Sequence, residues 1–176
     1  AIQECFECSD NIPYFTAIFD EEISDFYSWI IPKEKYLLLG SALKPKKNVR
    51  EKFDMLKAKL AKSGFHFDNK IGTEGAYIYR PNRISQFCVG RDDIALVGEA
   101  AGAISPSSAE GISYALKSSL YLAQSLEGGL DGFLERYQHK VRNIKLNLLI
   151  KNLKSPAMYN PILRRLIMKS SILSIT

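Results

Sequence analysis

Residues 94–126 constrain this chain more than any other stretch, because they predict a buried strand, a tight turn and a helix. The four apolar residues 94–97 are too few for a helix and are typical of a buried strand. In residues 98–102 the side chains are small apart from one glutamate, which allows the backbone to come close to a ligand. After Pro106, apolar residues recur at intervals of three and four, which predicts a helix starting near Glu110 and Gly111. Proteins of the α/β class use this arrangement to bind anionic or electron-rich ligands.

The segment GEAAGAISPSSAEGI, residues 98–112, resembles the second FAD-binding motif of the p-hydroxybenzoate-hydroxylase-type flavoproteins. It is most similar to the motif of their geranylgeranyl reductase branch. The residues that fit that pattern with its spacing are Gly98, Ala100, Ala101, Gly102, Pro106, Glu110, Gly111 and Ile112. Two positions depart from it, since Glu99 replaces an Asp and Ala109 replaces the first Gly of G-E-G-I. The resemblance implies that this segment, including Glu99, binds FAD.

The chemistry of these residues agrees with a flavin. The carboxylate of Glu99 can accept a hydrogen bond from a ribityl hydroxyl. The amides of Gly111 and Ile112 lie at the start of the predicted helix, where the dipole places about half a positive charge. They would stabilise the negative charge that gathers on the pyrimidine edge of a reduced flavin. The alternative is a plain buried strand, turn and helix, in which Glu110 only complements the helix dipole.

The N-terminal part of the chain predicts an antiparallel sheet. Residues 1–8 can form a strand, and three aromatic or β-branched segments follow at 14–19, 26–31 and 36–43. Pro32 is expected to end the second of these segments, and the polar residues 33–35 suit a hairpin turn. Consecutive hairpins with polar turns give an antiparallel sheet.

The predicted hairpin carries a second resemblance, to the Y-x-W-x-F-P and G-x-G patterns that line the prenyl cavity of geranylgeranyl reductases. The matching residues are Tyr27, Trp29, Pro32 and Gly40, whereas Ile31 and Ala42 depart from the patterns. The resemblance implies an apolar substrate, and two aromatic residues at i and i+2 share one face of a strand. Gly40 would let a substrate or flavin approach the neighbouring strand. One alternative is that Tyr27 and Trp29 are simply core residues. Another is a flavin-dependent halogenase, because Ile31-Pro32 resembles the W-x-W-x-I-P form of that family.

Composition excludes several classes of function. The chain has 176 residues, 46% hydrophobic residues and a net charge of +5, and no nucleic-acid-binding motif accompanies that charge. No uncharged apolar run is long enough to span a membrane. Cys5 and Cys8 form a C-x-x-C without the ligands that would complete a zinc site. We therefore expect no metal, no nucleic acid, reduced thiols and a cytoplasmic protein.

The remaining segments are expected to be structural. A helix is predicted from Asn48, as its cap, to about residue 63, with an apolar stripe of Val49, Phe53, Leu56 and Leu60 facing the core. His66 lies between two phenylalanines. Residues 72–80 predict a glycine-broken strand. Arg80 or Arg83 could contact a phosphate or a carboxylate there, and the default expectation is that both face solvent. A further helix over 130–154 should be broken by Pro156. The last segment, from Pro161, either packs on its own protein or forms a surface that touches a membrane. The residues that favour a membrane are Leu163, Arg164, Arg165, Leu166, Ile167, Lys169 and Ile172.

These observations predict an α/β flavoprotein portion, with an antiparallel substrate-domain sheet and the last strand and C-terminal helices of a Rossmann-like FAD domain. We expect a substrate-binding part at 1–90, the FAD motif at 91–127 and C-terminal helices at 128–176. No G-x-G-x-x-G turn is present, so we expect the N-terminal Rossmann part to lie in a longer protein that contains this chain.

The expected activity is an FAD-dependent reduction of C=C bonds in an isoprenoid or other apolar substrate, with NAD(P)H or a ferredoxin-like protein as electron donor. A monooxygenase or halogenase of the same superfamily, or a non-catalytic binding module, is the alternative. No residue is assigned as a catalytic acid or base, and Tyr27 is the nearest candidate for a proton donor.

Overall fold

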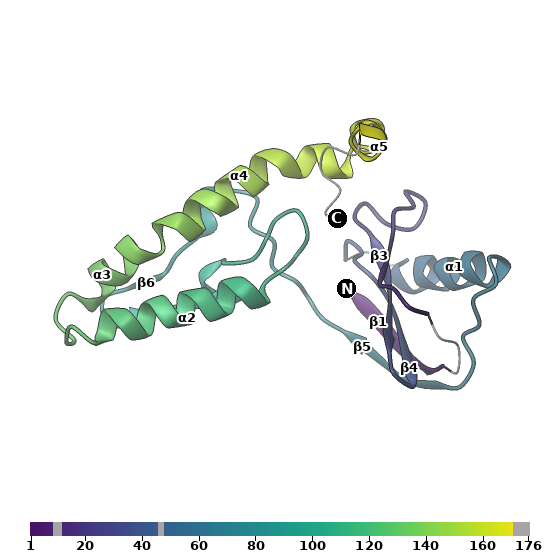
Figure 1. Cartoon of the computed structure of the whole chain (residues 1–176), viewed down its shortest axis with the longest axis horizontal. Coiled ribbons are helices and arrows are strands. Elements are labelled where there is room, and N and C mark those ends of the chain that lie inside the picture. Colours follow the sequence, from purple (N-terminus) through teal and green to yellow (C-terminus); the bar gives the residue numbers. More distant parts are fainter. Residues whose placement is uncertain (9–11, 46–47, 171–176) are drawn as a thin grey trace. The chain divides into compact units, whose positions relative to one another are not determined.

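The structure is a computed structural model that describes residues 1–8, 12–45 and 48–170, the last four of these by their backbone only. The chain divides into two units, Ala1–Tyr77 and Ile78–Thr176 (Figure 1). Each unit has its own hydrophobic core. Each is therefore described by itself.

The first unit is built on a five-stranded sheet in the order β2-β3-β4-β1-β5, with every neighbouring pair antiparallel. The strands are β1 (Ile2–Glu7), β2 (Thr16–Ile18), β3 (Ser28–Lys33), β4 (Tyr36–Ser41) and β5 (Lys70–Gly75). The predicted antiparallel sheet is confirmed. Residues 72–80 were expected to form one strand, but β5 ends at Gly75.

Strand β3 does not end at Pro32, as the sequence led us to expect. Pro32 lies inside the strand and pairs with Leu37 of β4. Strand β2 pairs only with residues 28–30 of β3, so β3 is an edge strand at Pro32. Proline is tolerated at such a position because an edge leaves room for a missing N–H.

Helix α1 (Val49–Lys62) covers one face of this sheet (Figure 1). It buries Phe53, Leu56 and Leu60, three residues of its predicted apolar stripe. These side chains pack against the inward-facing strand residues, which include Phe6, Ile30, Leu37 and Leu39. Asn48 was expected to cap the helix through its side chain, but its backbone carbonyl accepts the bond from Lys52 N–H instead, at 3.1 Å.

A fully buried carboxylate lies on the α1 side of the sheet. Glu4 of β1 is 0% exposed, and its oxygens contact Arg50 Nη2 at 2.8 Å and Lys57 Nζ at 3.0 Å. Lys70 Nζ, at 3.5 Å, and Thr73 Oγ1, at 3.3 Å, complete the cluster. Burial by itself raises the pKa of Glu4, but hydrogen bonds and charges from Lys57 and Arg50 outweigh burial and hold the pKa below 4.5.

The second unit consists mainly of helices around a core that includes Tyr114, Tyr137 and Leu148. Its elements are η1 (Ile84–Gln86), β6 (Gly90–Arg91), β7 (Ile94–Ala95), η2 (Gly98–Ala101), α2 (Ile112–Leu126), α3 (Phe133–Lys140), α4 (Arg142–Tyr159) and α5 (Pro161–Ser170). Helix α2 packs against α3, and Tyr114 of α2 meets α4 in the core, where its hydroxyl donates to Asn147 Oδ1 at 2.5 Å (Figure 1).

Three sequence-based expectations for this unit need correction. The segment expected as a buried strand at 94–97 forms only the two-residue β7, which pairs with β6, and Ile94 is 68% exposed. The helix expected over 130–154 is divided into α3 and α4 at Val141. Pro156 does not break α4, which continues to Tyr159 because Ser155 and Tyr159 are both anchored by hydrogen bonds to the loop before α2.

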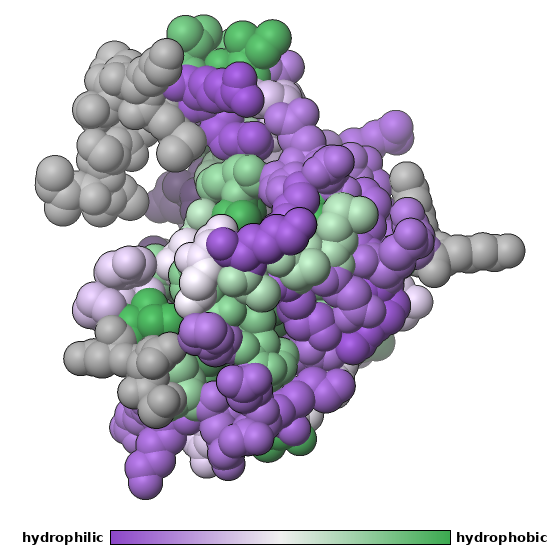
Figure 2. All heavy atoms as spheres, turned by 90° about the vertical axis from the view of Figure 1, so that its right-hand side faces the viewer, coloured by the Kyte–Doolittle hydropathy of each residue, from purple (hydrophilic) through white to green (hydrophobic). Residues whose placement is uncertain are grey.

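In the part of the chain that the structure describes, no helix is long and apolar enough to cross a membrane. Figure 2 shows hydrophilic residues around smaller hydrophobic areas on one face of the molecule. Several large apolar side chains are nevertheless exposed, and those of α2 and α4 are considered below.

Candidate functional site

The turn of the 98–112 motif is a single 3-10 turn, η2, bounded by two glycines in the left-handed region. Gly98 has φ +57° and Gly102 has φ +74°. A Cβ on Gly102 would lie 2.6 Å from the carbonyl oxygen of Gln86, so the backbones meet there too closely for any side chain. Gly98 and Gly102 are therefore required by the fold of the turn itself.

Helix α2 supports this turn through a buried serine. Ser118 is 1% exposed, accepts a hydrogen bond from Gly98 N–H at 2.9 Å and donates one to the Ala115 carbonyl at 3.0 Å. A Cβ on Gly98 would lie 3.1 Å from that of Ala115. The inward face of α2 is thus shaped to hold η2 close to the first turns of the helix.

Glu99 is exposed on this turn. One carboxylate oxygen, Oε1, accepts a hydrogen bond from the N–H of Tyr79 at 2.9 Å. Among the described residues, no other group donates to this carboxylate. Its second oxygen is therefore open to a hydroxyl group, and the neighbouring Ala100 is exposed as well.

The N-terminus of α2 presents free backbone amides. Within the described part of the chain, no group accepts a hydrogen bond from Gly111 N–H or Ile112 N–H, and Ile112 is 79% exposed. The next amide, that of Ser113, donates to Glu110 Oε1 at 3.2 Å. The other oxygen of Glu110, Oε2, lies 3.7 Å from Lys151 Nζ of α4. The Glu110 carboxylate is therefore occupied by the Ser113 amide and by Lys151. Two amides at the positive end of the helix remain for an acceptor.

The loop between η2 and α2 is tied down by residues that the sequence did not single out for this role. Arg80 and Ser155 both donate to the carbonyl of the buried Pro106, and the Tyr159 hydroxyl donates to the Ser107 carbonyl. The Arg80 guanidinium also lies 5.0 Å from the centre of the Tyr159 ring. The expectation that Arg80 faces solvent is therefore wrong. These contacts join residues 26, 49 and 52 positions apart, a separation for which no local pattern gives a signal.

Ala109 explains one departure from the family pattern. It has φ +55°, a left-handed conformation that L-residues adopt at a cost and glycine adopts freely. The position at which geranylgeranyl reductases carry a glycine is thus one whose backbone requires positive φ. The alanine keeps that backbone, held by the hydrogen bond from its N–H to the Ser105 carbonyl at 2.9 Å.

The change Ala109→Gly is expected to raise the free energy of unfolding by up to about 1 kcal/mol, because relief of the strained φ exceeds the greater entropy of glycine in the unfolded chain. Thermal or urea unfolding measures the difference. The matched control is Ala123→Gly at an exposed position inside α2, which should lower stability by about 1 kcal/mol. Equal destabilisation by both changes would contradict the strain at Ala109.

In the first unit, three of the four predicted substrate residues lie together on the sheet face opposite α1. The ring centres of Tyr27 and Trp29 are 5.8 Å apart, and Trp29 pairs with Gly40 across β3 and β4. Trp29 Nε1 donates to Gln3 Oε1 at 3.0 Å. Pro32 is not part of this group, because strand alternation turns it to the other face.

Gly40 does not provide the open space that we expected for a ligand. A Cβ there would lie 2.2 Å from Cε2 of Trp29, so the indole ring itself fills the position above the glycine. Tyr27 and Trp29 are each half-buried, which places them neither in the core nor fully in solvent. The face they share is a partly exposed aromatic wall.

The cysteines show no metal site. Cys5, Cys8 and Cys88 form no disulfide, and the described residues contain no group of three or more His, Cys, Asp or Glu side chains placed to hold an ion. Cys8 and His66 line a cavity of about 560 Å³ beside Glu7 and Asp68. This cavity is separate from the aromatic wall, since Trp29 and Gly40 are absent from its lining.

Comparison with solved structures identifies the architecture. The structure matches a geranylgeranyl bacteriochlorophyll reductase-like protein from Thermoplasma acidophilum with a TM-score of 0.67 and 17% identity, over 99% of this chain and 47% of that one. This chain has the fold of half of that protein. No model of a protein family matches the sequence.

Two curated relatives are similar over almost the whole chain. The proteins called CbrA from Escherichia coli O157:H7 and Shigella sonnei are each 38% identical over 172 residues, which is 98% of this chain. The chain spans about half the length of these relatives, 48% in both cases. The fold match confirms a mixed α/β portion with an antiparallel sheet, and leaves the assigned roles of the site residues as predictions.

Proposed function

We propose that this chain is part of an FAD-dependent oxidoreductase that reduces C=C bonds of an isoprenoid-like or other apolar substrate. The observation that carries the proposal is that one fifteen-residue motif contains an exposed carboxylate on η2 and, among the described residues, two backbone amides without an acceptor at the start of α2. The likeness in fold to a geranylgeranyl bacteriochlorophyll reductase-like protein supports it.

The residues of the second unit fit the FAD that the motif resemblance implies. Glu99 would accept a ribityl hydroxyl on its open oxygen, and the amides of Gly111 and Ile112 would bind the electron-rich edge of the isoalloxazine. Gly98, Ala100, Gly102 and Pro106 would shape the turn, with Glu110 holding the helix end. Bound flavin would supply the hydride, with NAD(P)H or a ferredoxin-like donor reducing it in turn.

The first unit would supply the substrate surface. Tyr27 and Trp29 form an aromatic wall that carries the phenol hydroxyl of Tyr27, whereas the indole N–H of Trp29 is already donated to Gln3 Oε1. Gly40 leaves room for the Trp29 indole, because a side chain there would overlap the ring. Pro32 lies in the hairpin, where it pairs with Leu37. We propose the parts 1–90 for substrate, 91–127 for FAD and 128–176 as supporting helices.

The alternative of a binding module without chemistry was motivated by Glu99 and Ala109. The left-handed backbone at Ala109 weakens this alternative, because the alanine preserves the conformation of the glycine it replaces. A halogenase remains the other alternative. Products distinguish the two enzymes, since a halogenase would chlorinate an aromatic substrate whereas a reductase would saturate a prenyl chain.

The flavin prediction is tested on the full-length protein. The purified protein should show a flavin absorbance band, and Glu99→Ala should weaken FAD binding about tenfold or more, because a charge-assisted hydrogen bond contributes about 1.5–3 kcal/mol. Glu127→Ala, at the exposed far end of α2, is the matched control and should leave FAD binding unchanged. A colourless protein that also fails to take up added FAD would refute the assignment.

A further inference from the structure

We propose that the outward face of α4 binds the surface of a membrane that contains anionic lipids. This proposal is independent of the flavin site. It begins from an apolar stripe on the solvent side of the helix, formed by Leu146, Leu149, Ile150 and Leu153. Their spacing of three and four places them on one side, and Leu153 is 75% exposed.

The stripe is separate from the face that packs in the core. Ile144 and Leu148, on the opposite side of α4, are 4% and 2% exposed and belong to the core with Tyr114. Lys151 also faces inward, with its ammonium 5.1 Å from the centre of the Tyr114 ring. Helix α4 is therefore apolar on two sides, and the described residues of its unit cover one of them.

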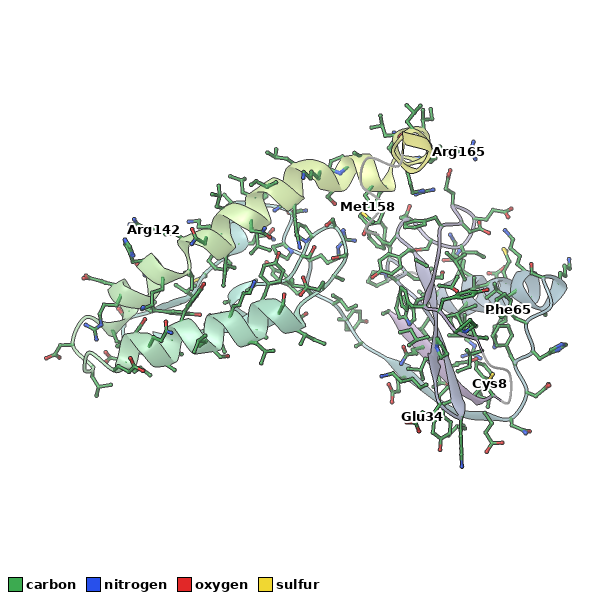
Figure 3. The ribbon with its side chains drawn as sticks, in the orientation of Figure 1. Cys8, Glu34, Phe65, Arg142, Met158 and Arg165 are labelled. Carbon is green, nitrogen blue, oxygen red and sulfur yellow. The ribbon has the colours of Figure 1, made fainter. Side chains whose placement is uncertain are left out.

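Basic side chains flank the uncovered stripe. Lys145 and Lys154 are exposed, and a rotation of 100° per residue places them on opposite borders of the stripe. Arg142, at the start of the helix, extends away from α2 (Figure 3). An apolar face with Lys and Arg along its borders is the pattern of a helix that lies in a membrane interface.

The positive charge of residues 136–176 favours an anionic membrane surface as the partner. Residues 136–176 contain nine Lys or Arg and no Asp or Glu, whereas the rest of the chain carries an excess of acidic residues. Such a segment is attracted to a surface of anionic headgroups. A nucleic acid is the other common polyanion, but its affinity comes mainly from contacts of Lys and Arg with phosphates, to which an aliphatic stripe adds nothing. A membrane interface uses both the charges and the apolar stripe.

Helix α5 also exposes apolar side chains next to basic ones. Ile162, Leu163 and Leu166 are 70%, 45% and 60% exposed, and Arg165 is exposed beside them. The side chains of Ile167 and Lys169, and all of Ile172, lie outside the described residues. The proposed membrane-binding surface therefore consists of α4 and the first part of α5.

The test is sedimentation of the full-length protein with vesicles of phosphatidylcholine alone and of phosphatidylcholine with phosphatidylglycerol. We expect binding to the anionic vesicles that weakens at high salt. The pair Leu146→Gln and Leu153→Gln should reduce partitioning about tenfold or more. The pair Lys145→Gln and Lys154→Gln should reduce it about 25-fold, or about fivefold for each charge.

The matched control lies on α2, which has its own outward apolar residues. Leu116 and Leu120 are 68% and 55% exposed, and Lys117 is the single charged residue in α2. Leu116→Gln with Leu120→Gln should leave vesicle binding unchanged. The proposal is overturned if the unmodified protein does not bind anionic vesicles, binds neutral ones equally, or loses as much binding through the α2 pair.

Discussion

Replacement of Glu4 by alanine is expected to lower the free energy of unfolding by about 3 kcal/mol, as removal of one partner from a buried ionic cluster does. Glu4 is fully buried, and Arg50, Lys57 and Lys70 point their charges at it. These cations are partly exposed and recover some hydration, which keeps the loss at the lower end of the range. Urea unfolding followed by circular dichroism measures the change.

The control for Glu4 is Asp54→Ala. Asp54 contacts the same two cations, with Oδ1 2.9 Å from Lys57 and Oδ2 3.4 Å from Arg50, but its side chain is half exposed. An exposed ion pair contributes about 0–1 kcal/mol, so this variant should remain close to the unmodified protein. If both variants lowered the free energy of unfolding equally, burial would not be the reason for the large contribution of Glu4 to stability.

The Glu4 cluster also predicts a dependence on pH. The folded pKa lies below the ordinary value of 4.5, so the stabilisation is fully present above that value and is lost as pH falls through the folded pKa. The neutral variant Glu4→Gln lacks this contribution. The stability difference between the two proteins should therefore narrow below about pH 4.5.

Gly40→Ala is expected to lower the free energy of unfolding by about 3 kcal/mol, through overpacking against the Trp29 indole and loss of its hydrogen bond to Gln3. Trp29 is the single tryptophan of the chain, so its fluorescence reports the displacement directly. Thermal unfolding and the emission maximum are measured together.

Gly72→Ala is the control for Gly40, because Gly72 also lies in a strand of the sheet and a Cβ there would meet nothing within 4 Å. This variant should change neither the emission nor the stability by much. An unshifted emission maximum in Gly40→Ala would show that the indole does not occupy the space above Gly40.

The sequence predicted the elements whose signals are local. Polar turns and β-rich segments identified the antiparallel sheet, and the spacing of Phe53, Leu56 and Leu60 identified the buried face of α1. The same logic failed at Pro156, where proline was expected to end a helix that in fact continues. Local propensity there is outweighed by tertiary contacts of the residues on either side.

The candidate site was predictable only in part, for the same reason. The motif marked Glu99, Gly111 and Ile112 by spacing, and the structure shows an open carboxylate and free amides there. The sequence could not show that the Trp29 ring fills the space over Gly40, because that depends on strand register. Nor could it show that Glu4 is buried, since its cations come from a helix and a distant strand.

The anchoring of the Pro106 loop has a practical consequence for anyone who shortens this protein. Ser155 and Tyr159 hold that loop from the last turns of α4, more than forty positions along the chain. A truncation that ends before Ser155 would therefore release the Pro106 loop, although that loop lies far from the deleted residues in the sequence. If such a truncation lost the proposed FAD, the cause would be a loosened loop rather than a missing ligand residue, and faster hydrogen exchange at residues 103–110 would reveal it.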